Sequence, residues 1–116
     1  MSTIIYHNPR CSKSRQTLEL LNEKGVDAEV IEYLKTPPDS ETLEKILQGL
    51  SMEPRELMRK GQDEYKSLKL DDESLTREQL IKAMIENPIL IERPIVMTDK
   101  GIAIGRPLEN VEKILS

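Results

Sequence analysis

A strand–helix–strand pattern in the first part of the chain limits the fold more than any other feature of the sequence. The β-branched and aromatic run at 3–6 predicts a short buried strand, which ends where Pro9 interrupts ladder pairing. Apolar residues then recur at helical spacing from Ser12 to a basic residue and a glycine at 24–25, which are typical of a helix C-terminus. The alternating run at 28–34 predicts a second strand before two prolines turn the chain. These residues therefore form a β-α-β unit.

The middle of the chain is predicted to be helical. Asp39 or Ser40 can cap a helix with four apolar residues at helical spacing, and 54–60 suits a short helix with proline in its first turn. A further helix begins with a capping box and ends before a proline. The residues behind these predictions are Leu43, Ile46, Leu47 and Leu50 in the first helix, and Thr76, Gln79 and Pro88 in the last.

The end of the chain predicts a β-hairpin and a closing helix. Two apolar runs within 95–105 are joined by a turn at 98–101, and 109–115 favours a helix. The order β-α-β, helices, β-β-α predicts an α/β chain with a thioredoxin-like fold, a mixed four-stranded sheet and a helical insertion at about 36–87. Because 116 residues suffice for one core but not for two, we expect a single domain over residues 1–116.

Charge is unevenly distributed along the sequence. Seventeen Lys and Arg residues against 21 Asp and Glu residues give a net charge of −4, so we expect neither nucleic acid nor an anionic membrane as a partner. The first 16 residues nevertheless contain Arg10, Lys13 and Arg15 and no acidic residue. A small cationic cluster on an acidic chain favours a small anion as its ligand.

The sequence contains one cysteine, Cys11, and one histidine, His7. One cysteine cannot form an intrachain disulfide, which favours a reducing compartment, and two soft ligands are too few for a metal centre. No run approaches the roughly 20 apolar residues of a membrane span, and the N-terminus lacks a signal-peptide pattern. We therefore expect a cytoplasmic protein with no bound metal or cofactor.

Cys11 is predicted to lie at the start of the first helix, where backbone N–H groups and the positive end of the helix dipole favour a thiolate. The cationic cluster acts in the same direction, and His7, Ser12 and Ser14 can add hydrogen bonds to the sulfur. The alternative is a buried cysteine with a packing role only. Because Cys11 stands between Arg10 and Ser12 rather than among apolar residues, the sequence favours a nucleophile beside an oxyanion site.

Two other thiol chemistries fit the spacing poorly. Ser14 stands where a Cys-x-x-Cys redox pair would have its second cysteine, so a partner thiol is needed to release a mixed disulfide. Thr17 stands where a phosphatase-type Cys-x5-Arg loop requires arginine. We therefore expect a single-cysteine mechanism with an external thiol.

Five segments distributed over the whole chain have a familiar order and spacing: YHNPRCSKSRQTLELL, YLKTPP, ELMRK, NPILIERPIVMT and IGRPLENV. Together they resemble the ArsC family of glutaredoxin-coupled arsenate reductases. The resemblance implies that Cys11 attacks arsenate and that Arg59, Arg93 and Arg106 hold the oxyanion. Guanidinium groups suit this role because they offer a fixed fork of donors to a tetrahedral anion.

The resemblance also implies supporting residues around the thiol. His7 would assist thiolate formation and Ser14 would hydrogen-bond to the sulfur. Pro94 would be the cis-proline that thioredoxin-type folds place beside the active cysteine, although an X-Pro bond is cis in only about 5–6% of folded cases. Arg10 departs from the family pattern, since some members have a small residue there, and we expect its extra charge to strengthen anion binding or tune glutathione docking. From the local charge pattern, Arg15 would add positive charge near the thiol.

The implied mechanism uses glutathione as co-substrate. The Cys11 thiolate attacks arsenate with loss of water, glutathione reduces and thiolates the adduct, and a glutaredoxin resolves the mixed disulfide as arsenite leaves. Two alternatives remain. One is a glutathione-dependent thiol oxidoreductase with another substrate, which turnover of arsenate would distinguish. The other is a non-catalytic regulator similar to the Spx proteins, which share this fold, bind RNA polymerase and commonly carry the Cys-x-x-Cys pair that this chain lacks.

Overall fold

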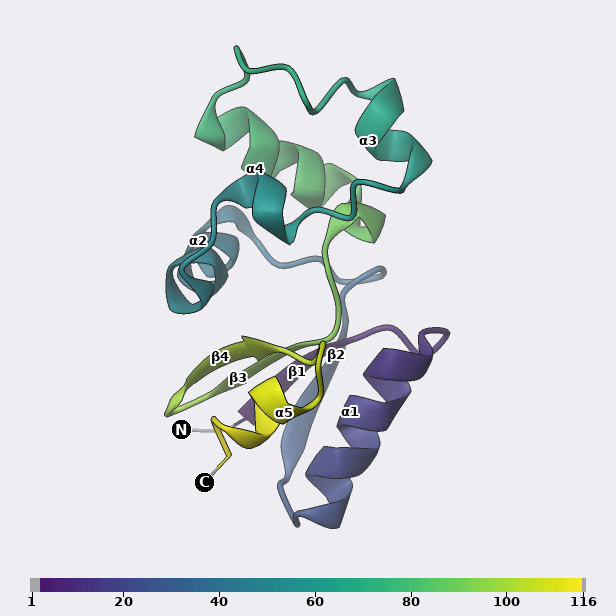
Figure 1. Ribbon diagram of the computed structural model, residues 1–116, viewed down its shortest axis with the longest axis vertical. Coiled ribbons are helices and arrows are strands. Elements are labelled where there is room, and N and C mark those ends of the chain that lie inside the picture. Colours follow the sequence, from purple (N-terminus) through teal and green to yellow (C-terminus); the bar gives the residue numbers. More distant parts are fainter. Residues whose placement is uncertain (1–2, 116) are drawn as a thin grey trace. The chain divides into compact units, whose positions relative to one another are not determined.

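The computed structural model describes residues 3–115. They form two compact units (Figure 1). The sheet unit is built from the chain up to Thr36 and from Arg93 onward, and the helical unit is Pro37–Glu92. The insertion expected at about 36–87 overlaps in sequence with the helical unit, and a single domain for the whole chain stays a prediction.

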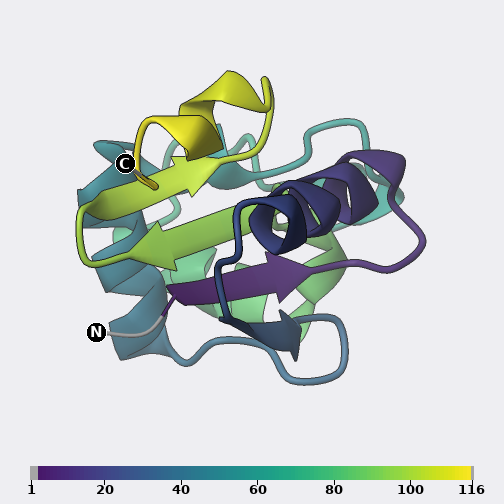
Figure 2. The same cartoon turned by 90° about the horizontal axis from the view of Figure 1, so that it is seen from below.

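In the described residues, the sheet unit contains a four-stranded mixed sheet of order β2-β1-β3-β4 (Figure 2). β1 runs parallel to β2 and antiparallel to β3, and β3 pairs antiparallel with β4. The strands are β1 (Thr3–His7), β2 (Ala28–Glu32), β3 (Ile95–Thr98) and β4 (Gly101–Ile104). The β-α-β unit and the closing hairpin are confirmed, and the fold is the expected α/β thioredoxin-like arrangement.

The core of the sheet unit lies between the sheet and the helices α1 (Ser12–Glu23) and α5 (Glu109–Glu112). Ile5, Val96 and Ala103 are register neighbours on β1, β3 and β4, so their side chains point to the same face. Leu21 of α1 and Val111 of α5 pack with them, and both are fully buried. Each buried aliphatic side chain contributes about 1.5–3 kcal/mol, and this packing fixes α1 against the sheet.

The helical unit contains α2 (Ser40–Leu50), η1 (Pro54–Leu57), α3 (Asp63–Ser67), α4 (Arg77–Glu86) and η2 (Pro88–Leu90). The predicted N-caps are confirmed. The Asp39 carboxylate accepts the Thr42 N–H at 2.8 Å, and Thr76 and Gln79 form a reciprocal capping box at 2.8 and 3.2 Å. Fully buried residues of this unit are Leu43, Ile46, Leu47, Leu57, Met84, Leu90 and, at 2%, Ile91.

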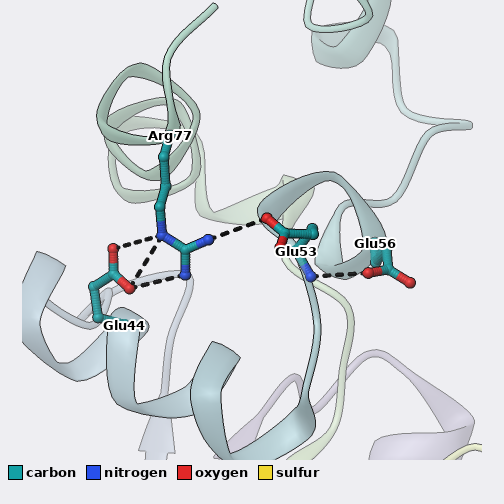
Figure 3. Close-up of polar contacts among 4 residues, drawn as sticks. All are labelled: Glu44, Glu53, Glu56 and Arg77. Atoms are coloured by element: carbon teal, nitrogen blue, oxygen red, sulfur yellow. Dashed lines mark hydrogen bonds and ion pairs between the residues drawn. The ribbon is translucent and has the colours of Figure 1, made fainter.

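Arg77 connects three parts of the helical unit (Figure 3). From the first turn of α4 its guanidinium donates to Glu44 of α2 at 2.9–3.3 Å and to Glu53, which precedes η1, at 3.2 Å. The Glu53 N–H in turn donates to the Glu56 carboxylate at 2.9 Å. All of the planar nitrogen atoms of Arg77 are therefore used within the unit.

Several predicted boundaries are wrong, each for a local reason. The second strand ends at Glu32 rather than 34, because the Glu32 carbonyl accepts the N–H groups of residues 35 and 36 and turns the chain. The helix predicted at 54–60 ends at Leu57, because Met58 is extended and bridges to Ile91. The closing helix is regular only over Glu109–Glu112. In the described part of the chain, no helix combines the length and apolarity needed to span a membrane.

Candidate active site

Cys11 occupies the N-cap of α1, directly after the turn that leaves β1. Its N–H donates to the Asn8 carbonyl at 3.0 Å, and its carbonyl accepts the Arg15 N–H at 3.0 Å as the first bond of the helix. The Asn8 side chain closes the same turn by accepting the Arg10 N–H at 3.0 Å. The residue is 9% exposed, so the turn presents the sulfur at the helix start with little access to bulk water.

The surroundings of Cys11 favour the thiolate. Burial on its own raises the pKa of the thiol, but the backbone N–H of Ser14, the Arg106 guanidinium, the charge of Arg93 and the backbone N–H of Lys13 together lower that pKa below its ordinary value. Arg106 Nη2 donates to Cys11 Sγ at 3.5 Å. This arrangement separates Cys11 from an inert packing cysteine, whose pKa burial would raise.

His7, at the end of β1, and Ser14, in the first turn of α1, form a buried hydrogen-bonded pair. His7 Nδ1 lies 2.6 Å from Ser14 Oγ, which also accepts the Asn8 N–H at 3.0 Å. Because Ser14 is fully buried, its hydroxyl needs an acceptor for its proton, and His7 Nδ1 is the acceptor within reach. We therefore assign the hydroxyl as the donor to Nδ1, which places the proton of the neutral ring on Nε2. Burial lowers the pKa of His7, Arg15 adds to this effect and Glu32 opposes it.

Ser14 therefore contacts the sulfur differently from the expectation. Its backbone N–H, not its hydroxyl, favours the Cys11 thiolate, and the hydroxyl binds His7 and Asn8 instead. His7 thereby connects the end of β1 to the first turn of α1, and its assistance in thiolate formation stays a prediction.

Arg93 and Arg106 reach Cys11 from the two ends of the β3–β4 hairpin. The Arg93–Pro94 peptide bond is cis, as the resemblance implies, and Arg106–Pro107 is a second cis bond that the sequence did not predict. The Gly105 N–H donates to the Pro94 carbonyl at 3.0 Å, which ties the two ends together. Two arginines that are distant from Cys11 in the sequence thus act on its sulfur.

Gly105 is a site residue that sequence reasoning missed. A Cβ atom at this position would lie 2.5 Å from Thr17 Oγ1 and 2.8 Å from Pro94 Cγ, so no side chain fits between α1 and the Pro94 segment. Thr17 is itself fully buried and donates to the Lys13 carbonyl at 2.9 Å. The only sequence signal was the position of the glycine directly before Arg106.

The geometry is that of a thiol of lowered pKa with the Arg106 guanidinium donating to its sulfur, and comparison with known proteins identifies the family. Residues 6–114 match the profile of the ArsC family. The chain belongs to the ArsC family. It is 56% identical to "Uncharacterized protein YfgD" of Escherichia coli (strain K12) over 96% of this chain and 94% of that one. It is 49% identical to an "Arsenate reductase" of Neisseria meningitidis serogroup A over 96% of both chains.

Solved structures of the ArsC family agree with the fold described above. The structure entitled "Arsenate reductase from Vibrio cholerae" superposes with a TM-score of 0.94 at 48% identity, covering 99% of this chain and 98% of that one. The thioredoxin-like fold and the resemblance on which the sequence analysis relied are therefore confirmed.

Of the basic residues that the ArsC resemblance or the cationic cluster suggested, Arg15 and Arg59 have other contacts and Arg10 is exposed. Arg15 Nη1 donates to the Pro9 carbonyl at 2.9 Å and so braces the turn before Cys11, and Arg10 is exposed. Arg59 belongs to the helical unit, where its guanidinium lies 3.9 Å from the Glu92 carboxylate. A role for Arg59 in oxyanion binding stays a prediction. Among the described residues, no group of three or more His, Cys, Asp or Glu side chains is arranged to hold a metal ion.

Proposed function

We propose that this ArsC-family protein reduces arsenate to arsenite, with Cys11 as the nucleophile and with glutathione and glutaredoxin as reductants. One observation carries the proposal: a thiol of lowered pKa receives a hydrogen bond from the exposed guanidinium of Arg106. Similarity to proteins named arsenate reductase supports the choice of oxyanion. The single cysteine and its reducing compartment favour an external thiol as the electron donor.

Arg106 and Arg93 offset the cost of bringing two anions together. An arsenate ion must approach a thiolate, and guanidinium groups already beside the sulfur neutralise charge without reorganising. Within the described residues, Arg106 uses one of its N–H groups on the sulfur, which leaves further donors of a planar fork for the arsenate oxygens. Lysine offers no such bidentate geometry.

The proposed reaction has two steps, after which the Cys11 thiol is regenerated. The Cys11 thiol and arsenic acid form a sulfur–arsenic bond and release one water. Glutathione then attacks, the electron pair of the sulfur–arsenic bond stays on arsenic, and arsenite leaves while Cys11 and glutathione form a mixed disulfide. A glutaredoxin thiol then attacks the glutathione sulfur of the mixed disulfide, accepts the glutathione and releases the Cys11 thiol. Overall, two thiols supply two electrons and arsenate loses one oxygen as water.

The test is arsenate-dependent NADPH consumption with glutathione, glutaredoxin and glutathione reductase. The wild type should turn over, Cys11→Ser should not, and Ser12→Ala should retain turnover because Ser12 is the exposed neighbour of the nucleophile. Turnover by Cys11→Ser would exclude the mechanism. An inactive wild type with working coupling enzymes would exclude arsenate and favour another substrate for the same thiol.

The predicted role of Arg59 has its own test. If Arg59 holds the oxyanion, Arg59→Met should raise the KM for arsenate and leave the pKa of Cys11 unchanged. An unchanged KM would remove Arg59 from the oxyanion-binding residues.

A further inference from the structure

A groove lies between α1 and the connection from β4 to α5. It has a volume of about 400 Å³ and is lined by Lys13, Gln16 and residues 105–109. We refer to it as the Arg106 groove. Arg106 both lines the groove and donates to Cys11 Sγ, so a molecule that contacts its guanidinium from the groove is adjacent to the reacting sulfur. Its volume falls within the usual range of small-molecule sites, about 300–1,000 Å³.

The charges of the Arg106 groove have a definite pattern. Two cations, Lys13 and Arg106, and one anion, Glu109, surround it, and the Gln16 amide adds a donor and an acceptor. Glutathione carries the complementary set of two carboxylates, one ammonium and two peptide groups. Lys13 favours the Cys11 thiolate through its backbone N–H, and among the described residues its side chain makes no ion pair, so its charge is available to a ligand in the groove.

We propose that the Arg106 groove binds the glutathione molecule that reduces the Cys11 adduct. Lys13 and Arg106 bind its carboxylates, Glu109 its ammonium and Gln16 its peptide groups. This inference rests on the proposed function, because it names the place of that reaction's thiol co-substrate.

A second hollow, lined in part by the turn that precedes Cys11, is the competing location. It has a volume of about 240 Å³ and is lined by His7–Arg10, Glu32, Leu34 and Lys35. Its charges are partly neutralised, because Lys35 Nζ lies 3.6 Å from the Glu32 carboxylate, and its His7 ring is bonded to Ser14. It is also smaller, and in the described contacts it contains no donor to the sulfur. These differences favour the Arg106 groove.

The first experiment follows backbone amide NMR signals while S-methylglutathione, which cannot react, is added to the wild type. If S-methylglutathione binds in the Arg106 groove, the amide signals of Gln16, Gly105 and Leu108 should shift, and those of Leu34 and Lys35 should not. Shifts confined to Leu34 and Lys35, or no shift at the groove residues, would overturn the proposal. Because no arsenate is present, the result does not depend on whether the protein reduces arsenate.

The second experiment uses a matched pair of exposed lysines. Lys13→Met keeps the apolar stem and removes the charge, and it should raise the KM for glutathione about fivefold, with the KM for arsenate unchanged. Lys35→Met should leave both constants unchanged. Equal glutathione KM values for Lys13→Met and the wild type, or a rise only in Lys35→Met, would contradict the assignment.

Discussion

In the helical unit, Arg77 donates to the carboxylates of Glu44 and Glu53, whereas in the sheet unit Arg106 donates to the sulfur of Cys11. Arg55 resembles Arg77 in this respect, because it donates to the carbonyls of Leu70 and Asp72 at 2.9 and 2.6 Å. The helical unit thus supplies these arginines with oxygen acceptors of its own. Arg106 is exposed, and its described acceptor is a single polarizable atom at 3.5 Å.

The difference distinguishes structural arginines from those available to a ligand. An arginine whose donors are all engaged by neighbouring oxygens has little to offer an incoming anion. An arginine held beside a thiolate keeps some of its N–H donors available to a ligand and also stabilises the nucleophile. The experiments below test this distinction, beginning with the largest expected effect.

Arg106→Met should cause the largest loss of activity. Removing a preorganised donor beside the developing charge typically costs about 10²–10³-fold in rate, and loss of the same hydrogen bond should raise the pKa of Cys11. Steady-state arsenate reduction and the pH dependence of thiol alkylation measure the two effects.

Arg77→Met is the matched control, and the opposite result is expected. The variant should keep its activity per folded molecule and lower the midpoint of thermal unfolding by at most about 5 °C, because its ion pairs are partly exposed. Equal loss of activity in Arg77→Met and Arg106→Met would contradict the distinction between structural arginines and those available to a ligand.

Gly105→Ala should weaken the site without changing any charged group. The added Cβ would lie 2.5 Å from Thr17 Oγ1, so the segment that carries Arg106 must shift. We expect a loss of about 1–3 kcal/mol in the free energy of unfolding and a raised pKa of Cys11. Gly61→Ala is the control, since a Cβ there meets no atom within 4 Å. If the pKa of Cys11 in Gly105→Ala equals that of the wild type, the close approach at Gly105 does not position Arg106.

Ser14→Ala tests the buried pair of His7 and Ser14. It removes the acceptor of the Asn8 N–H and the partner of His7 Nδ1, and we expect a loss of about 1–2 kcal/mol in the free energy of unfolding. Ser12→Ala, at an exposed position of the same turn, should have almost no effect. Chemical denaturation compares the two, and equal stabilities would contradict the role given to Ser14.

The smallest effect concerns His7 and pH. Because the pKa of His7 is lowered in the folded state, the unfolded chain takes up a proton more readily. The stabilising contribution of neutral His7 is therefore complete above the ordinary histidine pKa of about 6.5 and declines as the pH falls through the lower folded value. Denaturation of the wild type and His7→Gln at several pH values should show a steeper acid loss in the wild type. Parallel curves would refute this.

The parts of the fold that local chemistry determines could be predicted from the sequence. The capping box of Thr76 and Gln79, the Asp39 cap and the hairpin after Ile95 are all as expected. α3 (Asp63–Ser67) was missed, because it has no buried residue and so lacks the apolar spacing that signals a helix. Strand and helix ends at Glu32 and Leu57 depend on bonds to other segments, which spacing does not reveal.

The candidate site also has features that neighbouring residues predict and features that depend on distant segments. The position of Cys11 at a helix start follows from neighbouring residues alone. The approach of Arg106, which is 95 residues further along the chain, could be expected only through the resemblance to the ArsC family. The requirement for glycine at 105 arises from tertiary packing against Thr17 and Pro94, which no local pattern encodes.

The most direct test of the account is the rate of Cys11 alkylation by iodoacetamide as a function of pH, with and without arsenate. Because the thiolate is the reacting species and the sequence has one cysteine, the rate reports the ionisation of this thiol. The account predicts a midpoint below the free cysteine value of about 8.5, and slower alkylation when arsenate is bound. A midpoint at or above that value, with no protection by arsenate, would contradict it.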